Sequence, residues 1–171
     1  SPAANPDAMG LGALCDHIER AHHDWLREEL PRLDFMTRKV AAVHGDHEPR
    51  LHEIRHVFEL FQSEIAVHTA EEERLVFPAI RQLESGSGNR AAGVAALRSV
   101  FAKLESEHGQ AGAALEQLSA LTDRYMPPEW ACNTFRAMFD TLGRLQSNMH
   151  QHVHKENNVL FPRALALGSS S

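Results

Sequence analysis

The chain contains 171 residues and carries a net charge of -6, from 17 basic and 23 acidic side chains. This length favours one domain with a single core, and the acidic balance argues against a nucleic-acid or anionic-membrane partner. Hydrophobic residues make up 43% of the chain, yet no run of about 18 apolar residues occurs, which indicates a globular protein without a membrane span. Residues 1–10 lack the features of a signal peptide. Two cysteines are too few for a disulfide scaffold and favour a reducing, cytoplasmic location.

The N-terminal half is expected to contain two long helices. Residues 1–10 form a polar lead that we expect to be flexible. The first helix is predicted over residues 11–43, with a kink or a break and restart near Pro31. The second helix is predicted over residues 49–84, because its apolar residues recur at alternating spacings of three and four. Its stripe consists of Leu51, Ile54, Phe58, Phe61, Ile65, His68, Glu72, Leu75 and Ala79.

The C-terminal half repeats this organisation. A Gly- and Ser-rich linker at residues 85–89 precedes a third helix predicted over residues 90–125. A fourth helix is predicted over residues 129–167, and residues 168–171 are expected to be a disordered tail. Four helices of similar length joined by short loops predict an all-α fold, an up-down-up-down antiparallel four-helix bundle over residues 11–167.

One motif occurs twice, in the second and fourth predicted helices. In both copies a histidine is followed four residues later by a glutamate, and a Phe-Pro pair begins five residues after that glutamate. Positions i and i+4 lie on one face of a helix, and both pairs fall on the apolar stripes, where a glutamate is costly unless it is paired or bound to a cation. The alternative is two salt-bridged pairs, which the recurrence on both stripes disfavours. The copies are His68, Glu72, Phe77 and Pro78, and His152, Glu156, Phe161 and Pro162.

The first and third predicted helices each add one histidine near mid-helix. His108 lies on the apolar stripe of the third helix, and His23, in competition with its neighbour His22, lies on the first. Antiparallel packing brings these residues to a common level, where the two glutamates can bridge two metal ions with two histidines on each ion. This mixed imidazole–carboxylate set suits iron, with manganese or zinc less favoured. The predicted metal ligands are His23, His68, Glu72, His108, His152 and Glu156.

The remaining candidate residues receive other roles. His44 lies 21 positions beyond His23, about 31 Å along a continuous helix, so it is excluded from the ligand set and placed at the far end of the bundle. Asp24 and Glu105 are predicted to orient ligand imidazoles as hydrogen-bond acceptors. Phe77 and Phe161 are predicted to pack beside the site. Surface or supporting positions are expected for His17, His47, His52, His56, His150 and His154, and buried free thiols for Cys15 and Cys132.

With these motifs, the sequence resembles the hemerythrin-like (HHE cation-binding) domains, and most closely the di-iron proteins for repair of iron–sulfur clusters. The resemblance covers residues 14–167 and is most specific at Glu156-Asn157-Asn158-Val159-Leu160-Phe161-Pro162. It implies a non-haem centre of two iron ions, oxo- or hydroxo-bridged, held by the six residues named above. His44 also matches a histidine of functional interest in this family.

Two departures narrow what the resemblance implies. Oxygen-carrying hemerythrins have a second histidine four residues after the one on the third helix, where this chain has Gly112, and an Asp five residues after the last histidine, where this chain has Glu at four. One fewer nitrogen ligand disfavours simple reversible oxygen carriage. The full-length repair proteins resemble this chain preceded by a small domain that carries a cysteine pair, which is missing from this sequence either natively or by truncation.

The resemblance therefore implies a cytoplasmic di-iron protein of the nitrosative and oxidative stress response. It would bind or reduce nitric oxide, or supply iron for iron–sulfur cluster repair. An enzymatic activity, if present, would be of the nitric oxide reductase type or a peroxide-reactive di-iron activity. Its expected partners are nitric oxide or oxygen, iron–sulfur client proteins and an electron donor, without nucleic acid or membrane, in a monomer or dimer. The alternatives are a sensor of oxygen, nitric oxide or redox state without turnover, and an iron store.

Overall fold

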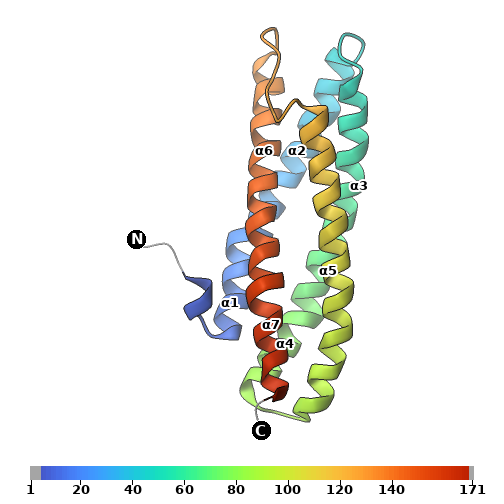
Figure 1. The fold of residues 1–171 in the computed structure, drawn as a ribbon. Helices are drawn as coiled ribbons and strands as arrows, with labels where there is room; N and C mark the ends of the chain where they lie inside the picture. Colours follow the sequence, from blue (N-terminus) through green and yellow to red (C-terminus); the bar gives the residue numbers. More distant parts are fainter. Residues whose placement is uncertain (1–4, 170–171) are drawn as a thin grey trace.

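The computed structural model describes residues 5–169, which form an elongated helical bundle (Figure 1). Within this range there is no strand, and no helix is long and apolar enough to cross a membrane. Residues 1–4 and 170–171, parts of the expected flexible lead and disordered tail, lie outside the described residues. The neighbouring segments Pro6–Ala8 and Leu167–Ser169 each form a short 3-10 turn.

Four long rods make up the bundle, and three of them contain a π-helical turn. Figure 1 shows the rods side by side, with the connections between successive rods at alternate ends of the molecule. The first rod consists of α1 (Leu11–Ile18), the π turn Glu19–His23 and α2 (Asp24–His44), and the second of α3 (Arg50–Glu71), the π turn Glu72–Val76 and α4 (Phe77–Ser85). The third rod is the single helix α5 (Arg90–Leu121). The fourth rod consists of α6 (Asn133–His154), the π turn Lys155–Leu160 and α7 (Phe161–Ala166).

The ends of these helices follow local backbone chemistry. Gly86 adopts a left-handed φ of 78° after α4, and the Asn89 side chain accepts a hydrogen bond from the Ala92 N–H at the start of α5. The third helix ends at Leu121 rather than at residue 125, because residues 123–125 all have positive φ and cannot continue a right-handed helix. The fourth helix begins at Asn133 rather than at residue 129.

Of the kink or break predicted near Pro31, the break is not observed. The helix α2 continues through Pro31, and the irregular turn of this rod lies upstream at Glu19–His23. In the second and fourth rods, by contrast, each π turn lies directly before a Phe-Pro pair. A proline supplies no N–H and its ring collides with the carbonyl four residues earlier, so the turn before Pro78 or Pro162 widens to i→i−5 hydrogen bonds.

The π turn shifts the buried face of the second rod by one residue. The prediction that Leu75 and Ala79 continue the apolar stripe was wrong, since Leu75 is exposed and Ala79 is only half-buried. Val76 and Ile80 are buried instead. A π turn inserts one residue into the helical repeat, so every later core position moves by one. The helix α5 has no such turn, and its entire predicted stripe is buried.

The hydrophobic core consists of two separate clusters. One cluster contains buried residues of α2, α3, α6 and the C-terminal half of α5, and the other contains those of α1, α4, α7 and the N-terminal half of α5. Along α5 the change occurs between Leu104 and Ala111, and His108 lies between them. The buried histidines and glutamates thus form a polar layer that separates the two clusters.

Candidate metal centre

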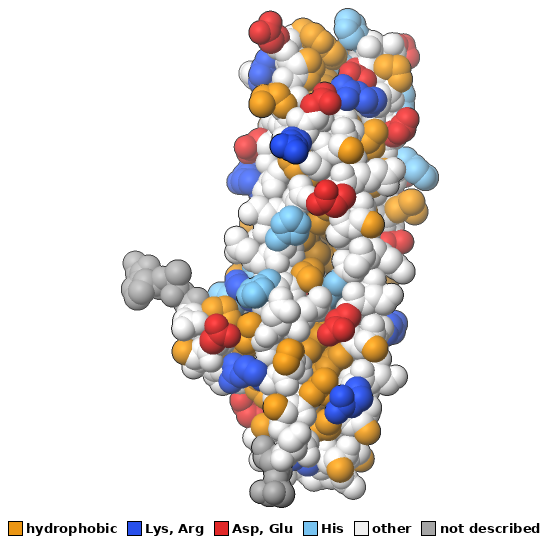
Figure 2. Space-filling view, in the orientation of Figure 1, with side chains coloured by type: hydrophobic (Ala, Val, Ile, Leu, Met, Phe, Trp, Pro, Cys, Tyr) orange, Lys and Arg blue, Asp and Glu red, His pale blue; other side chains and the backbone are white. Residues whose placement is uncertain are grey.

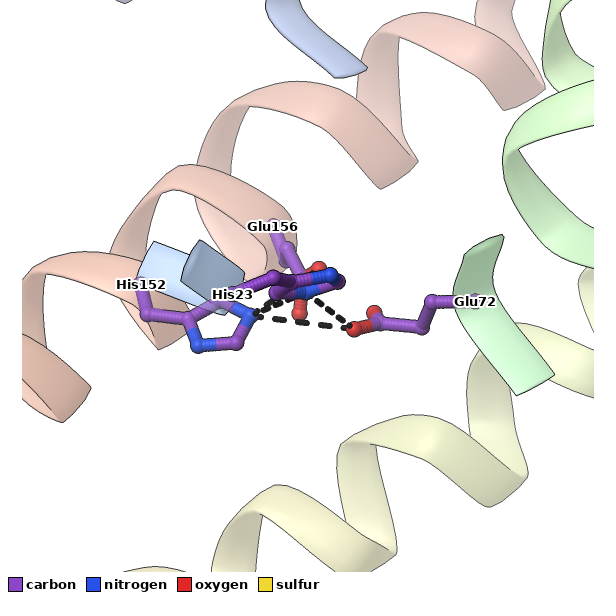
Figure 3. A group of neighbouring side chains, drawn as sticks. All are labelled: His23, Glu72, His152 and Glu156. Atoms are coloured by element: carbon purple, nitrogen blue, oxygen red, sulfur yellow. Dashed lines mark hydrogen bonds and ion pairs between the residues drawn. The ribbon is translucent and has the colours of Figure 1, made fainter. Parts of the chain in front are cut away.

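The structure brings all six sequence-predicted ligands together, each of them buried. They form two overlapping groups in which one donor atom of each residue lies within 4.8 Å of the others. Figure 3 shows the first group, in which His23 of the first rod and Glu72 of the second rod meet His152 and Glu156 of the fourth rod. The groups are His23, His152, Glu72 and Glu156, and His68, His108, Glu72 and Glu156.

The imidazoles face each other in pairs with the spacing of two ligands on one ion. The Nε2 atoms of His23 and His152 are 3.3 Å apart, and those of His68 and His108 are 3.0 Å apart. Two nitrogens that each lie about 2.1 Å from one metal ion, at the roughly right angle of an octahedral site, are about 3.0 Å apart. Each pair is therefore spaced to share one ion.

The two carboxylates belong to both groups. Glu72 Oε1 lies 3.2 Å from Nε2 of His23 and 3.4 Å from Nε2 of His68, so it reaches one imidazole of each pair. Glu156 does the same with its two oxygens, 2.9 Å from Nε2 of His108 and 3.4 Å from Nε2 of His152. This arrangement fits two carboxylates that bridge a pair of ions.

The buried polar atoms of the cluster need a cation. Within the described residues, Glu72 Oε2 and both side-chain oxygens of Glu156 have no hydrogen-bond donor, although both residues are fully buried. Buried carboxylate oxygens without partners are strongly unfavourable unless a positive charge compensates them. Four imidazole nitrogens and two carboxylates match the ligands that divalent transition metals take in proteins, so the residues present fit a metal pair.

The pKa values of the cluster show the same demand for positive charge. Burial alone would lower the pKa of His152, but the carboxylates of Glu156 and Glu72 outweigh it and raise the pKa to about 10. Burial also opposes the rise for His68, whose pKa reaches about 8 mainly through Glu72. Burial would raise the pKa of Glu72, yet the side chains that face it, Glu156 and three histidines, hold it well below its usual value. Without a metal ion, protons on His152 and His68 balance the buried carboxylates.

The π turns position the glutamates of the cluster. The N–H of Phe77 donates to the carbonyl of Glu72, and the N–H of Phe161 donates to the carbonyl of Glu156, both five residues earlier. Both phenylalanines pack beside the cluster as predicted. The ring centroids of Phe77 and His23 are 5.6 Å apart, and those of Phe161 and His108 are 6.2 Å apart. The repeated Phe-Pro pair therefore both widens the turn that carries the carboxylate and closes the site on its apolar side.

The acceptors that orient the imidazoles are not the predicted ones. Nδ1 of His68 lies 3.2 Å from a Glu107 oxygen, and Nδ1 of His108 lies 2.8 Å from Oδ1 of Asn157. Because both acceptors take a proton from Nδ1, the Nε2 lone pairs point into the cluster.

The roles predicted for Asp24 and Glu105 were wrong. Asp24 pairs instead with Arg27, and Glu105 is exposed. Glu73 is the acidic group near His23, with one oxygen 3.6 Å from Nδ1 of His23. Glu107, Asn157 and Glu73 each follow or precede a predicted ligand by one position in the chain, and this adjacency is the signal that the sequence offered.

His22 has a different position from its neighbour His23. The Nε2 atom of His23 faces the cluster, whereas the buried His22 ring is stacked on His152, with centroids 5.2 Å apart and an interplanar angle of 4°. Burial lowers the pKa of His22 to about 3, so its ring is neutral. Sequence reasoning treated His22 only as a competing ligand and missed its contacts.

The other predictions on histidine and cysteine have clear outcomes. His44 lies at the end of α2 beside Trp130 and Phe135, away from the cluster, as its exclusion required. Cys15 is a buried free thiol as predicted, and burial raises its pKa to about 12. Cys132 was predicted to be buried but is exposed, because it lies in the turn before α6.

Clefts between the rods reach the imidazoles from outside. A cleft of about 250 Å³ between α5 and α6 is lined by His108, Gly112 and Met149. Two larger clefts border His68 and His23. A Cβ atom added at Gly112 would meet nothing within 4 Å, so the position that carries a histidine in oxygen carriers is open space here.

Comparison with known proteins shows similarity to a cation-binding family. A family model described as "Hemerythrin HHE cation binding domain" matches residues 16–164. A protein named "Iron-sulfur cluster repair protein YtfE" from Musicola paradisiaca is 38% identical over 158 residues, which span 92% of this chain and 67% of that protein. Proteins of the same name from an Enterobacter species and from Escherichia coli O1:K1 are 37% and 36% identical over 92% and 91% of this chain, and 68% and 67% of their own lengths. The chain belongs to the hemerythrin HHE cation-binding domain family.

Proposed function

We propose that this chain is a non-haem di-iron protein of the nitrosative and oxidative stress response that takes part in iron–sulfur cluster repair. The observation that carries the proposal is the pair of overlapping ligand groups joined by Glu72 and Glu156. The relatives are named iron–sulfur cluster repair proteins, which supports the repair role. The proposed clients are damaged iron–sulfur proteins, served together with an electron donor in the cytoplasm, where unpaired cysteines remain reduced.

The proposed ligands are the six clustered residues, with His23 and His152 on one ion and His68 and His108 on the other. Glu72 and Glu156 would bridge the ions, and an oxo or hydroxo group would complete the bridge. The proposed chain path is up-down-up-down, supported by connections that alternate between the two ends of the bundle (Figure 1). On this path the rods carrying the two repeated motifs run in the same direction, so both π turns face the centre at one level.

The residues of the chain prepare the site for a small ligand. Glu107 and Asn157 hold protons at Nδ1 of His68 and His108 and so keep their Nε2 atoms free to bind metal. Phe77 and Phe161 exclude water from the apolar side. When bound, a pair of iron ions supplies open coordination positions and electrons for a diatomic molecule. The space at Gly112 beside His108 leaves room for nitric oxide or oxygen to approach.

Elemental analysis with a visible spectrum is the first test. We expect two iron ions per chain and near-ultraviolet absorption typical of bridged diferric iron. A colourless protein that retains zinc under the same conditions would contradict the redox part of the proposal. The measurement needs no substrate and so separates the identity of the metal from the question of turnover.

The activity is tested by anaerobic mixing of the reduced protein with nitric oxide and by iron transfer to an apo iron–sulfur protein. Production of nitrous oxide supports reduction, and cluster reconstitution supports iron supply. Nitric oxide binding without either outcome would favour a sensor. The Glu72→Gln, Glu156→Gln double variant is the control, since it removes both bridging charges, and equal iron donation by this variant would refute the assigned site.

A further inference from the structure

Among the four clustered imidazoles, His23 and His152 lack the usual hydrogen bond on the outer nitrogen Nδ1. Nδ1 of His68 and of His108 each have an acceptor, and Nδ1 of His23 lies 3.6 Å from a Glu73 oxygen. Within the described residues, Nδ1 of His152 has neither a hydrogen-bond partner nor an acidic oxygen at ion-pair distance. Metal-binding histidines are generally oriented by such a bond, so another contact has to hold the plane of the His152 ring.

His22 provides that contact. Its ring lies parallel to the His152 ring, with an interplanar angle of 4° and a centroid distance of 5.2 Å, the geometry of an offset stack. His22 is as deeply buried as the clustered imidazoles, with 1% of its surface exposed. It is absent from both ligand groups, so its burial is not explained by metal binding.

The His22 ring is itself fixed at both edges. Lys155 Nζ lies 2.8 Å from Nε2 of His22, and since an ammonium can only donate, Nε2 accepts. Nδ1 therefore carries the proton and donates to Oδ1 of Asn148 at 2.9 Å. The Asn148 amide in turn donates to the Ala21 carbonyl at 3.3 Å, which sets its orientation.

The spacing of these residues follows from helix geometry. Asn148 and Lys155 lie four residues before and three residues after His152, so all three share one face of the fourth rod. The π turn Glu19–His23 then buries two successive histidines, with His23 facing the cluster and His22 facing this side of His152. His17 also accepts from Lys155, at 2.9 Å, but contacts His22 edge-on and is only half-buried.

We propose that His22 is a positioning residue for the metal centre, whose stacked ring, clamped between Asn148 and Lys155, aims Nε2 of His152 at one of the two ions. This inference rests on the proposed di-iron site and deepens it. It predicts an asymmetric effect, because His22 supports only the half of the centre formed by His23 and His152. The half formed by His68 and His108 keeps its own hydrogen-bonded acceptors.

The test compares iron release from His22→Ala, His22→Phe and His17→Ala with that from the wild-type protein. Each protein is loaded with ferrous iron in the absence of oxygen. A chelator that becomes coloured when it binds iron then removes the metal, and the release of each ion is followed as one kinetic phase. Loss of an orienting neighbour costs about 10-fold or more in metal affinity. We therefore expect His22→Ala to speed release of one ion by about tenfold and to leave the other unchanged. His22→Phe keeps a stacking ring and should retain slow release, and His17→Ala should behave as wild type.

Three results would overturn the inference. These are wild-type release from His22→Ala, release from His22→Phe as fast as from His22→Ala, and equal acceleration of both ions. If His22→Ala fails to fold, Asn148→Ala replaces it, since that change loosens one edge of the ring and should speed the same phase. Wild-type protein that takes up no iron would refute the proposed function itself, whereas a normally loaded wild type with an unaltered His22→Ala refutes this inference alone.

Discussion

Glu72 and Glu156 are fully buried and have oxygens without hydrogen-bond donors in the described structure. Each lies within ion-pair distance of imidazoles from both halves of the cluster. Such carboxylates are tolerated in a core only where positive charge faces them. At the scale of single residues, the negative charge of these two carboxylates is therefore balanced either by protons on the imidazoles or by bound metal ions.

Replacement of Glu72 by Gln should abolish binding of the metal pair. The amide keeps the size of the side chain but removes a charge shared by both ligand groups. The affinity for iron should therefore fall by about 100-fold or more, above the 10- to 100-fold loss that is typical of residues that only support a ligand. Elemental analysis and ferrous iron titration measure it. Glu71→Gln is the matched control, because Glu71 is the adjacent residue and pairs with Lys103 instead. Equal metal loss in the control would contradict the assignment.

The metal-free protein should lose stability as the pH rises. The pKa of His152 is raised to about 10 and that of His68 to about 8, from an ordinary value of 6.5. The folded protein therefore binds these protons more tightly than the unfolded chain, so their stabilisation is complete below about pH 6.5 and is lost as the pH rises through 8 and 10. Chemical denaturation at several pH values gives the free energy of unfolding. A flat profile from pH 6.5 to 10 would refute the argument.

At the scale of elements, the π turns distinguish this bundle from four regular helices. The turns Glu19–His23, Glu72–Val76 and Lys155–Leu160 each contain one of the proposed ligands. The third rod has a ligand but no π turn. Two of the turns stand before Phe-Pro pairs, which explains why a proline recurs at a position that would otherwise weaken a helix.

Replacement of Pro162 by Ala should weaken metal binding without unfolding the protein. The new N–H at position 162 can bond to the carbonyl four residues earlier, which favours a regular turn and turns Glu156 away from the cluster. We expect about 10-fold weaker iron binding, a loss of the size reported for groups that support a ligand, with unchanged helix content by circular dichroism.

Pro31→Ala is the control for this change, because α2 passes Pro31 without a π turn. Removal of an interior helix proline should raise stability, by up to about 3 kcal/mol, and leave metal binding unchanged. A Pro162→Ala protein that binds iron as tightly as Pro31→Ala would show that the π turn does not position Glu156.

At the scale of the whole molecule, a polar layer divides the apolar core. Every rod passes from one hydrophobic cluster through the layer into the other. The space-filling view shows hydrophobic side chains along the seam between the rods and charged groups scattered over the rest of that face (Figure 2). The two clusters are thus joined by continuous helices, and the layer between them is the part of the core that depends on bound cations.

Metal removal should lower the melting temperature of the whole bundle. A ligand present at 1,000 times its dissociation constant stabilises the folded state by about 4 kcal/mol, which for a chain of this size corresponds to about 10 °C. Calorimetry with and without a chelator measures the shift. One cooperative transition is expected in both states. In the Glu72→Gln, Glu156→Gln double variant the chelator should have no effect, and a persisting shift would place the metal elsewhere.

The sequence by itself determined the helical rods and the six clustered side chains. Apolar spacing is a local property, and it predicted the whole buried stripe of α5 from Val94 to Leu118. A histidine and glutamate four residues apart must share a helix face, so the two repeated pairs were recognisable before any packing was known.

Only the tertiary structure decided the pairing of the histidines, the register after each π turn and the contacts of His22. Whether Val76 or Leu75 faces the core depends on one inserted residue, which apolar spacing alone does not reveal. Similarly, the neighbours that orient His68, His108 and His152 come from other rods. Contacts between distant segments depend on how the rods rotate about their axes, and that rotation is set by the packing of the whole core.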